Sequence, residues 1–258
     1  MKTIVIAIAT QKGGVAKTAT AGALIAALKR MGHSVLGIDM DPQANLTDNL
    51  GGADAWDSVS IYNVLKKEKD ICEGIWQTPM CDFVPATILL AGIETELNSI
   101  TGRECRLREV LKKVKAEEKY NFIIIDTPPS LGTLTINALV AADYVVIPTM
   151  SDMSSTKGID QLYSTITNVR EYFNENLKIA GILFTRFNAR TNIGREILER
   201  TKEIATEMET KVFERTIRPS VVVPEANAMA KDLWTYSPES TVAQDYEAFA
   251  LELVKEVV

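Results

Sequence analysis

The sequence of 258 residues has only three cysteines, Cys72, Cys81 and Cys105, and a single histidine, His33. An odd number of scattered cysteines argues against a disulfide framework, and one histidine is too few to complete a Cys/His zinc site. No run of about 18 apolar residues is present that would span a membrane, and the first residues do not resemble a cleaved signal sequence. We therefore expect a cytoplasmic protein that does not associate with a membrane.

An excess of basic charge is also lacking. The chain has 28 lysines and arginines against 34 aspartates and glutamates, a formal charge of -6. Bulk charge of this sign argues against nucleic-acid binding. The total hides an asymmetry, because residues 178–218 contain nine basic and six acidic side chains and so carry +3, which leaves -9 for the rest. Any contact with nucleic acid is therefore expected within that segment.

Short runs rich in β-branched apolar residues alternate with segments of helical period. Continuous apolar strands separated by helices predict a parallel sheet buried on both faces. The predicted strands cover residues 3–9, 34–38, 122–125, 144–148, 179–185 and 211–217, and the predicted helices cover 18–31, 103–118, 133–141, 155–174, 192–207 and 239–258. The pattern predicts one doubly wound, mostly parallel α/β domain over residues 1–258, in which residues 45–98 form an irregular insertion or subdomain.

The first predicted strand runs directly into a glycine turn, Lys-Thr and a helix, which is the context of a phosphate-binding loop. Gly13 and Gly14 allow backbone N–H groups to surround an anion, and the helix N-terminus adds partial positive charge. Lys17 is suited to the β and γ phosphates and the Thr18 hydroxyl to Mg²⁺. The candidate nucleotide-binding residues are Lys12, Gly13, Gly14, Val15, Ala16, Lys17, Thr18 and Ala19.

Carboxylates follow two other predicted strands. Asp39 and Asp41 lie two residues apart after the second strand, and Asp126 follows four apolar residues. Ligands of open α/β sheets bind at the carboxyl ends of the strands, so these side chains are candidates for a metal or a water molecule. Taken alone, Asp41-Pro42 is equally consistent with an ordinary turn, whereas Asp126 at the end of a buried strand requires a cation or donors.

Lys12, directly before the glycine pair, makes the loop resemble the deviant Walker A motif xKGGxxK[ST] of the ParA/MinD family of ATPases. The segments Asp39-Met40-Asp41-Pro42-Gln43 and Asp126-Thr127-Pro128-Pro129-Ser130 resemble two further motifs of that family. The resemblance implies a P-loop fold that uses ATP and Mg²⁺. Most members have glycine where this chain has Ala16, and a methyl group there either crowds the phosphate or restricts the residue to negative φ.

The resemblance also implies residue roles. Lys12 would reach the phosphates of a partner protomer in a nucleotide-sandwich dimer. Lys12 and Lys17 would both stabilise the negative charge on the γ-phosphate during hydrolysis. Asp41 would position the attacking water, with Asp39 in a supporting role near the metal. The implied catalytic residues are Lys12, Lys17 and Asp41, and the implied metal-side residues are Thr18, Asp39 and Asp126.

Similarity to the short, Soj-like ParA proteins extends over almost the whole chain. It implies an ATP-dependent homodimer that binds DNA non-specifically, associates with the bacterial nucleoid and segregates plasmid or chromosomal DNA. Hydrolysis would be slow until a ParB-type centromere-binding partner stimulates it. The phosphate loop starts within the first dozen residues, so no operator-reading domain is expected before it. Residues 217–226 correspond to a family segment near the base, although the match is poor.

A strip of exposed cations is the candidate DNA contact. Ile193, Ile197, Ile204 and Met208 are expected to mark the inner face of the helix after Asn192, with cations on the outer one. The candidate DNA-binding residues are Arg186, Arg190, Arg195 and Lys202. Without the family resemblance, a solvated helix face is the favoured interpretation of the same cations.

Three other functions remain open. A MinD-like membrane-positioning ATPase requires a basic amphipathic C-terminal helix, but residues 239–258 contain five acidic side chains and one basic. An iron–sulfur reductase or scaffold of the same superfamily requires cysteines placed to bridge a cluster. The last alternative is a nucleotide-binding scaffold that Ala16 has made nearly inactive.

Overall fold

A central sheet organises the chain, and the computed structural model describes it over residues 2–51, 55 and 58–258, with only the backbone at 153 and 154. The strands in these residues form one seven-stranded sheet in the order β3-β4-β2-β5-β1-β6-β7. Neighbouring strands are parallel except β3, which pairs antiparallel with β4 at the edge. The strands are β1 (Ile4–Ile8), β2 (Val35–Asp39), β3 (Trp76–Gln77), β4 (Asp82–Val84), β5 (Phe122–Asp126), β6 (Tyr144–Thr149) and β7 (Lys178–Phe184).

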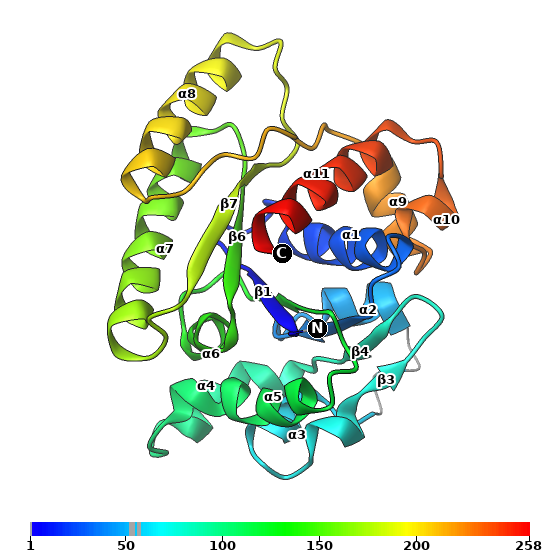
Figure 1. The fold of residues 1–258 in the computed structure, drawn as a ribbon, viewed down its shortest axis with the longest axis vertical. Helices are drawn as coiled ribbons and strands as arrows, with labels where there is room; N and C mark the ends of the chain where they lie inside the picture. Colours follow the sequence, from blue (N-terminus) through cyan, green and yellow to red (C-terminus); the bar gives the residue numbers. More distant parts are fainter. Residues whose placement is uncertain (1, 52–54, 56–57) are drawn as a thin grey trace.

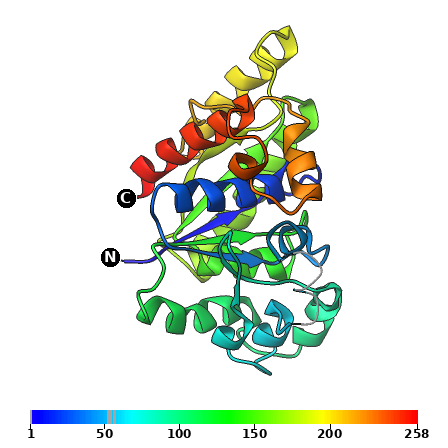
Figure 2. The same ribbon diagram turned by 90° about the vertical axis from the view of Figure 1, so that its right-hand side faces the viewer.

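Both faces of the sheet are covered by helices, as Figures 1 and 2 show. Helices α3, α5, α6 and α7 pack on one face, and α1, α2, α9, α10 and α11 pack on the other. Helix α8 lies against the β7 edge and extends beyond the sheet at the top of Figure 1. The α-helices are α1 (Lys17–Arg30), α2 (Asn45–Gly51), α3 (Ile61–Leu65), α4 (Ile93–Leu97), α5 (Arg106–Ala116), α6 (Thr133–Ala141), α7 (Met153–Tyr172), α8 (Asn192–Glu207), α9 (Val222–Ala228), α10 (Leu233–Tyr236) and α11 (Thr241–Val257).

Successive side chains of each strand point to opposite faces of the sheet, and both faces are covered, so the strand sequences are continuously apolar. In β1, Val5 and Ala7 join the core beneath α5 to α7, whereas Ile6 and Ile8 join the core beneath α1 and α11. All four side chains are fully buried. A strand covered on both faces gains nothing from polar residues at alternate positions. The doubly wound, mostly parallel α/β fold predicted from the sequence is therefore confirmed.

The predicted strand over residues 211–217 is wrong. The segment runs beside β7 and makes one isolated parallel bridge, Ile182 with Val212. Phe213 N and Ile217 N donate to the β7 carbonyls of Ile182 and Phe184 at 3.0 and 2.8 Å. Between them, the amide groups of Glu214 and Arg215 donate to the Glu252 carboxylate of α11, which interrupts the pairing. Backbone donors taken by a side chain cannot extend a strand ladder.

Residues 45–98 contribute to the same sheet. They supply β3 and β4, which the sequence patterns did not predict because both strands are very short. Phe83 and Val84 of β4 are fully buried and reach the two opposite cores. Residues 52–54 and 56–57 of this segment lie outside the described residues. The remainder forms short helices around the two strands.

Strand order brings the predicted motifs to one edge. Because β5 lies between β1 and β2, Asp126 at the end of β5 is in register with Ile8 of β1 and with Asp39 of β2. The phosphate loop leaves β1 at this same carboxyl edge, and α1 begins there. Three segments far apart in sequence therefore surround one point, as expected for the ligand site of an open α/β sheet.

Candidate nucleotide-binding site

The phosphate loop connects β1 to α1 through two left-handed residues. Gly14 has φ 76°, and Ala16 has φ 62° and ψ 33° directly before α1. The expected restriction of Ala16 to negative φ is therefore wrong. An alanine in this region costs about 1–2 kcal/mol relative to the right-handed one. The Ala16 carbonyl nevertheless accepts the helical hydrogen bond from Thr20 N at 2.8 Å.

Thr185, which follows β7, anchors the loop from the neighbouring part of the sheet. Its hydroxyl is fully buried and donates to the Val15 carbonyl at 3.0 Å, and the Thr149 carbonyl lies equally close. The Val15 carbonyl is held immediately before Ala16, so the backbone there cannot readily relax. Sequence analysis missed Thr185, because only the fold brings the end of β7 beside the end of β1.

Lys17, the first residue of α1, turns back into the loop. Its ammonium donates to the Lys12 carbonyl at 3.3 Å. Burial lowers the pKa of Lys17, and the nearby carboxylates of Asp126 and Asp41 oppose this change. The loop lysine and both predicted carboxylates are thus close enough to interact electrostatically, as the sequence predicted for one shared site.

The charge of the Asp126 carboxylate is poorly compensated within the protein. Both oxygens are buried and accept no hydrogen bond from any residue that the structure describes. Burial raises the pKa of Asp126 well above its ordinary value, and the negative charge of Asp39 raises it further, whereas the nearby Thr18 hydroxyl and Lys17 ammonium oppose this change. A buried carboxylate without donors is costly unless a cation approaches it. This orphaned group fits a metal-bound site beside the phosphate loop.

A magnesium ion beside Asp126 would need ligands other than protein side chains. In the described part of the chain, no three His, Cys, Asp or Glu side chains gather as a ready-made metal site. Magnesium commonly takes one or two protein oxygens and completes its shell with phosphates and water. The donor set around Asp126 and the Thr18 hydroxyl is therefore suited to magnesium that arrives with a nucleotide.

Asp39 contrasts with Asp126, although both are fully buried. One Asp39 oxygen accepts a hydrogen bond from Asp41 N at 3.0 Å, and the other accepts two from Thr47, from its N and its Oγ1, both at 2.8 Å. Burial still raises the pKa of Asp39 to about 6, with these hydrogen bonds acting in the opposite direction. Asp41 is 7% exposed, and one of its oxygens accepts from Gln43 N.

Lys12 points toward the first turn of α7. Its ammonium forms an ion pair with Asp152 at 2.5 Å and lies 3.4 Å from Ser155 Oγ. Ser155 N also donates to Asp152, which therefore holds both the helix start and the lysine. In this single chain Lys12 is held on its own protomer, a contact that no sequence pattern indicated.

A small cavity of about 110 Å³ adjoins the phosphate loop. It is lined by Ala16, Ala19, Arg186 and Tyr246 and by several residues of 217–227. The segment that the family resemblance placed near the base therefore does lie beside the loop. Arg218 makes a bidentate ion pair with Asp245 at 2.7 and 2.8 Å, which fixes the segment to α11.

The candidate DNA residues fall into two groups. Arg190, Arg195 and Lys202 are exposed at or along α8, where Lys202 pairs with Glu199 at 2.8 Å. Arg186 is also exposed but lines the cavity beside Ala16, so the structure does not place it on the outer side of α8.

The predicted inner face of α8 needs one correction. Ile197 and Met208 are each 2% exposed, whereas Ile193 is 56% exposed. Helix α8 extends past the sheet at its N-terminal end, so Ile193 has no core to enter (Figure 1).

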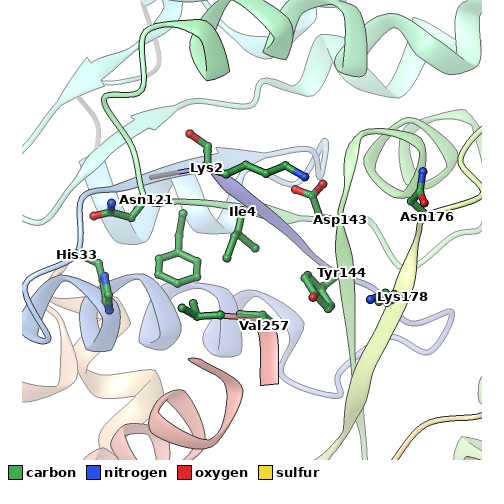
Figure 3. Close-up of a pocket in the computed structure, with 12 residues that line it drawn as sticks. Lys2, Ile4, His33, Asn121, Asp143, Tyr144, Asn176, Lys178 and Val257 are labelled. Carbon is green, nitrogen blue, oxygen red and sulfur yellow. The ribbon is translucent and has the colours of Figure 1, made fainter. Parts of the chain in front are cut away.

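Another cavity, of about 530 Å³, lies at the opposite edge of the sheet. Its lining includes Ile4, Phe122, Tyr144 and Lys178, which begin four parallel strands, together with His33 (Figure 3). The phosphate loop and the carboxylates are at the carboxyl ends of those strands. This cavity is therefore separate from the candidate nucleotide site.

The fold and the site together define a P-loop ATPase. A model of the AAA domain family matches residues 3–179. The chain is 42% identical to the sporulation initiation inhibitor protein Soj of Bacillus subtilis, over 98% of this chain and 97% of the relative. It is 36% identical to the chromosome partitioning protein ParA of Caulobacter vibrioides, over 98% and 93%. The chain belongs to the ParA/MinD family of ATPases.

Solved structures agree with this assignment. Cobyrinic acid a,c-diamide synthase of Mycobacterium smegmatis, with bound ADP and magnesium, has a TM-score of 0.84 and 34% identity, covering 98% of this chain and 94% of that one. A putative plasmid partition protein of Borrelia burgdorferi bound to AMPPNP has a TM-score of 0.79 and 25% identity, covering all of both chains.

Proposed function

We propose that this protein is a ParA-type partition ATPase, in which Mg-ATP closes a homodimer that binds DNA non-specifically and hydrolysis releases it. The observation that carries the proposal is the orphaned Asp126 carboxylate beside a loop that presents Lys12 and Lys17. The 42% and 36% identities to Soj and ParA proteins over nearly the whole chain support partition as the purpose of the switch.

The chemistry is attack of water on the γ-phosphate of ATP. Thr18 and Asp126 would hold magnesium, which when bound neutralises charge on the phosphates and orients them. Lys17 stabilises the negative charge that develops on the transferred group. Asp41, held at the carboxyl end of β2, positions the attacking water. The cavity beside Ala16 and Ala19 accommodates the base side of the nucleotide.

Lys12 links nucleotide binding to dimerisation. In the closed dimer it would contact the phosphates bound by the partner protomer. To do so its ammonium must leave Asp152, with which it pairs in the single chain. The two side chains of this ion pair are partly exposed, 28% and 39%, so solvent screens their attraction and the pair can exchange. The exchange replaces one carboxylate by a more highly charged phosphate group.

DNA binding would follow dimerisation. Arg190, Arg195 and Lys202 are exposed near or on α8, and a dimer presents them twice. A few phosphate contacts per protomer give weak binding alone and stronger, salt-sensitive binding in pairs. Arg186 would contribute from beside the nucleotide cavity. A ParB-type partner would stimulate hydrolysis, and the ATP-bound dimer would associate with the nucleoid in the cytoplasm.

The structure offers no observation in favour of the MinD-like alternative. No helix among the described residues is long and apolar enough to cross a membrane. The C-terminal helix α11 buries its apolar face, including Tyr246, Phe249 and Leu253, in the core against α1. An interfacial membrane helix needs such a face available for lipid.

The test is DNA binding by the purified protein with ADP, with ATP, and by the Asp41→Ala variant with ATP. We expect salt-sensitive binding only in the two ATP states, and longer-lived binding for the variant because its ATP persists. Gel filtration of the same samples reports dimerisation. Equal DNA binding with ADP and ATP would exclude the switch, and absence of phosphate release from the wild type with DNA and partner would indicate a non-catalytic scaffold.

A further inference from the structure

The loop between β2 and α2 is closed by the side chain of Asp39. The carboxylate accepts hydrogen bonds from Asp41 N, Thr47 N and Thr47 Oγ1 at 2.8–3.0 Å. These bonds join both ends of residues 40–46 to one buried group at the end of the strand. Asp41 lies within the closed segment, so its backbone position depends directly on Asp39.

Further contacts make this segment rigid. Ala44 N donates to the Asp41 carbonyl at 2.9 Å, and Ala44 has φ 53°. Met40 N donates to the Asp126 carbonyl at 2.9 Å. The Thr47 hydroxyl also accepts a hydrogen bond from Ala86 N at 2.9 Å, which ties the segment after β4 to the same group. The end of β2 and the segment after β4 therefore meet at the Asp39 and Thr47 pair, and β5 is bonded to Met40 beside it.

The two buried carboxylates at this edge differ in how their oxygens are used. Both Asp39 oxygens already accept protein donors, one of them twice. Neither Asp126 oxygen accepts any from the described residues. A metal ion competes with hydrogen-bond donors for the same lone pairs. A cation would therefore displace the bonds that hold residues 40–46 if it used Asp39, but would displace nothing if it used Asp126.

We propose that Asp39 is a positioning residue that acts through Thr47 and the backbone of residue 41 to aim the Asp41 carboxylate, and that it is not a magnesium ligand. This inference rests on the proposed role of Asp41 in hydrolysis. It replaces the supporting role near the metal that the family resemblance implied for Asp39.

The test compares Asp39→Asn, Thr47→Val and Thr47→Ser in steady-state ATP hydrolysis with DNA present. Asp39→Asn places an NH2 group where a donor already points, and Thr47→Val removes only the hydroxyl. We expect kcat to fall about tenfold for Asp39→Asn and about threefold or more for Thr47→Val, since one lost buried hydrogen bond is worth roughly that factor. The KM for ATP and the half-saturating Mg²⁺ concentration should stay within about twofold of wild type.

Thr47→Ser is the matched control because it keeps the hydroxyl, and its kcat should return to near the wild-type value. Circular dichroism and binding of a fluorescent ATP analogue establish that each variant is folded. A raised Mg²⁺ requirement in Asp39→Asn, together with an unaffected kcat in Thr47→Val, would overturn the inference and make Asp39 a metal ligand. If Asp39→Asn does not fold, the kcat values of Thr47→Val and Thr47→Ser still test the positioning role.

The wild type and Asp41→Ala separate this inference from the proposed function. Wild-type protein that hydrolyses no ATP, or Asp41→Ala that hydrolyses it normally, would contradict the proposed function itself. A slow Asp41→Ala variant combined with a wild-type kcat for Thr47→Val contradicts the positioning role only.

Discussion

Asp39 and Asp126 are partners in register on adjacent strands, yet their environments are opposite. Asp39 has three hydrogen-bond donors, and Asp126 has none among the described residues. Identical burial therefore has different consequences for the two carboxylates. The donors compensate the charge of Asp39 within the protein. The charge of Asp126 is offset only in part, by Lys17 and the Thr18 hydroxyl, and a bound cation would complete the compensation.

Asp126→Asn should stabilise the nucleotide-free protein at neutral pH. The substitution removes a buried charge that accepts no hydrogen bond from the described residues, at the loss of its attraction to Lys17. We expect a net gain of about 1–2 kcal/mol. At this chain length each kcal/mol raises Tm by about 2–4 °C. The same variant should lose the additional thermal stabilisation by Mg-ATP. Thermal melts with and without nucleotide measure both effects.

Asp39→Asn is the matched control and should lower Tm, because it breaks hydrogen bonds. The pKa of Asp126 is raised on folding, so the folded protein binds this proton more tightly than the unfolded chain does. Lowering the pH below the raised pKa therefore neutralises Asp126 and relieves the penalty. The advantage of Asp126→Asn should shrink accordingly. A variant less stable than wild type at neutral pH would contradict the expectation.

Ala16→Gly should stabilise the protein and tighten nucleotide binding. Glycine adopts the observed φ of 62° without the steric cost that alanine incurs. We expect a gain of up to about 1 kcal/mol, lessened by the greater freedom of glycine in the unfolded chain. The dissociation constant for ATP should fall several-fold, measured by calorimetry or fluorescence.

Ala26→Gly, in the interior of α1, is the control for the general effect of glycine. It should destabilise the protein by about 0.5–1 kcal/mol and leave ATP affinity unchanged. If both substitutions lowered stability equally, the left-handed conformation at Ala16 would not be a source of strain.

At the scale of elements, strand ends position the site and helix α8 presents the exposed cations. The N-terminal end of α8 extends beyond the core, so Arg195 and the exposed Ile193 lie on a projecting turn. The Arg195 guanidinium donates to Asn192 Oδ1 at 2.6 Å, which leaves most of its donors available. This end of the molecule can therefore meet a flat or convex partner such as a duplex.

Reversing Arg190 and Arg195 to Glu should weaken ATP-dependent DNA binding by more than tenfold, because two phosphate contacts per protomer become repulsions. ATP-dependent dimerisation should persist. The measurement is fluorescence anisotropy with labelled duplex DNA of two unrelated sequences. Lys112→Glu with Lys113→Glu on α5 makes the same change in net charge far from α8 and should have a much smaller effect. Equal losses for both pairs would assign the effect to net charge alone.

At the scale of the whole molecule, the charge distribution affects dimerisation and DNA binding in different ways. The formal charge is -6, although the candidate DNA contacts are basic. In the proposed switch, two acidic protomers would repel each other as they associate, and bound ATP would add further negative charge. Binding of the exposed cations to DNA is attractive and accompanied by release of counterions. Salt therefore acts in opposite directions on dimerisation and on DNA binding.

Raising KCl from about 50 to about 300 mM should tighten ATP-dependent dimerisation a few-fold and weaken DNA binding by tenfold or more. Asp41→Ala with ATP holds the nucleotide constant during the measurement. Analytical ultracentrifugation reports the dimer, and anisotropy reports the DNA complex. A dimer that dissociates in parallel with the DNA complex would mean that attractive charge pairs dominate the protomer interface.

Sequence patterns were sufficient to predict the α/β class, the strands β1, β2, β5, β6 and β7, and the phosphate loop with its carboxylates. These features depend on local periodicity, glycine spacing and the chemistry of residues next to one another in the chain. It also indicated the cations of α8, although Ile193 was wrongly assigned to the core.

The hydrogen-bond and charge partners of these residues depend on the tertiary structure. The bonds from Thr47 to Asp39, from Thr185 to the loop and from Lys12 to Asp152 join segments that different strands bring to one edge. The same holds for residues 211–217, where Glu214 N and Arg215 N donate to Glu252 of α11 and interrupt the pairing with β7. Local patterns determine what each segment can form, whereas the donors and charges available to it depend on neighbours that only folding supplies.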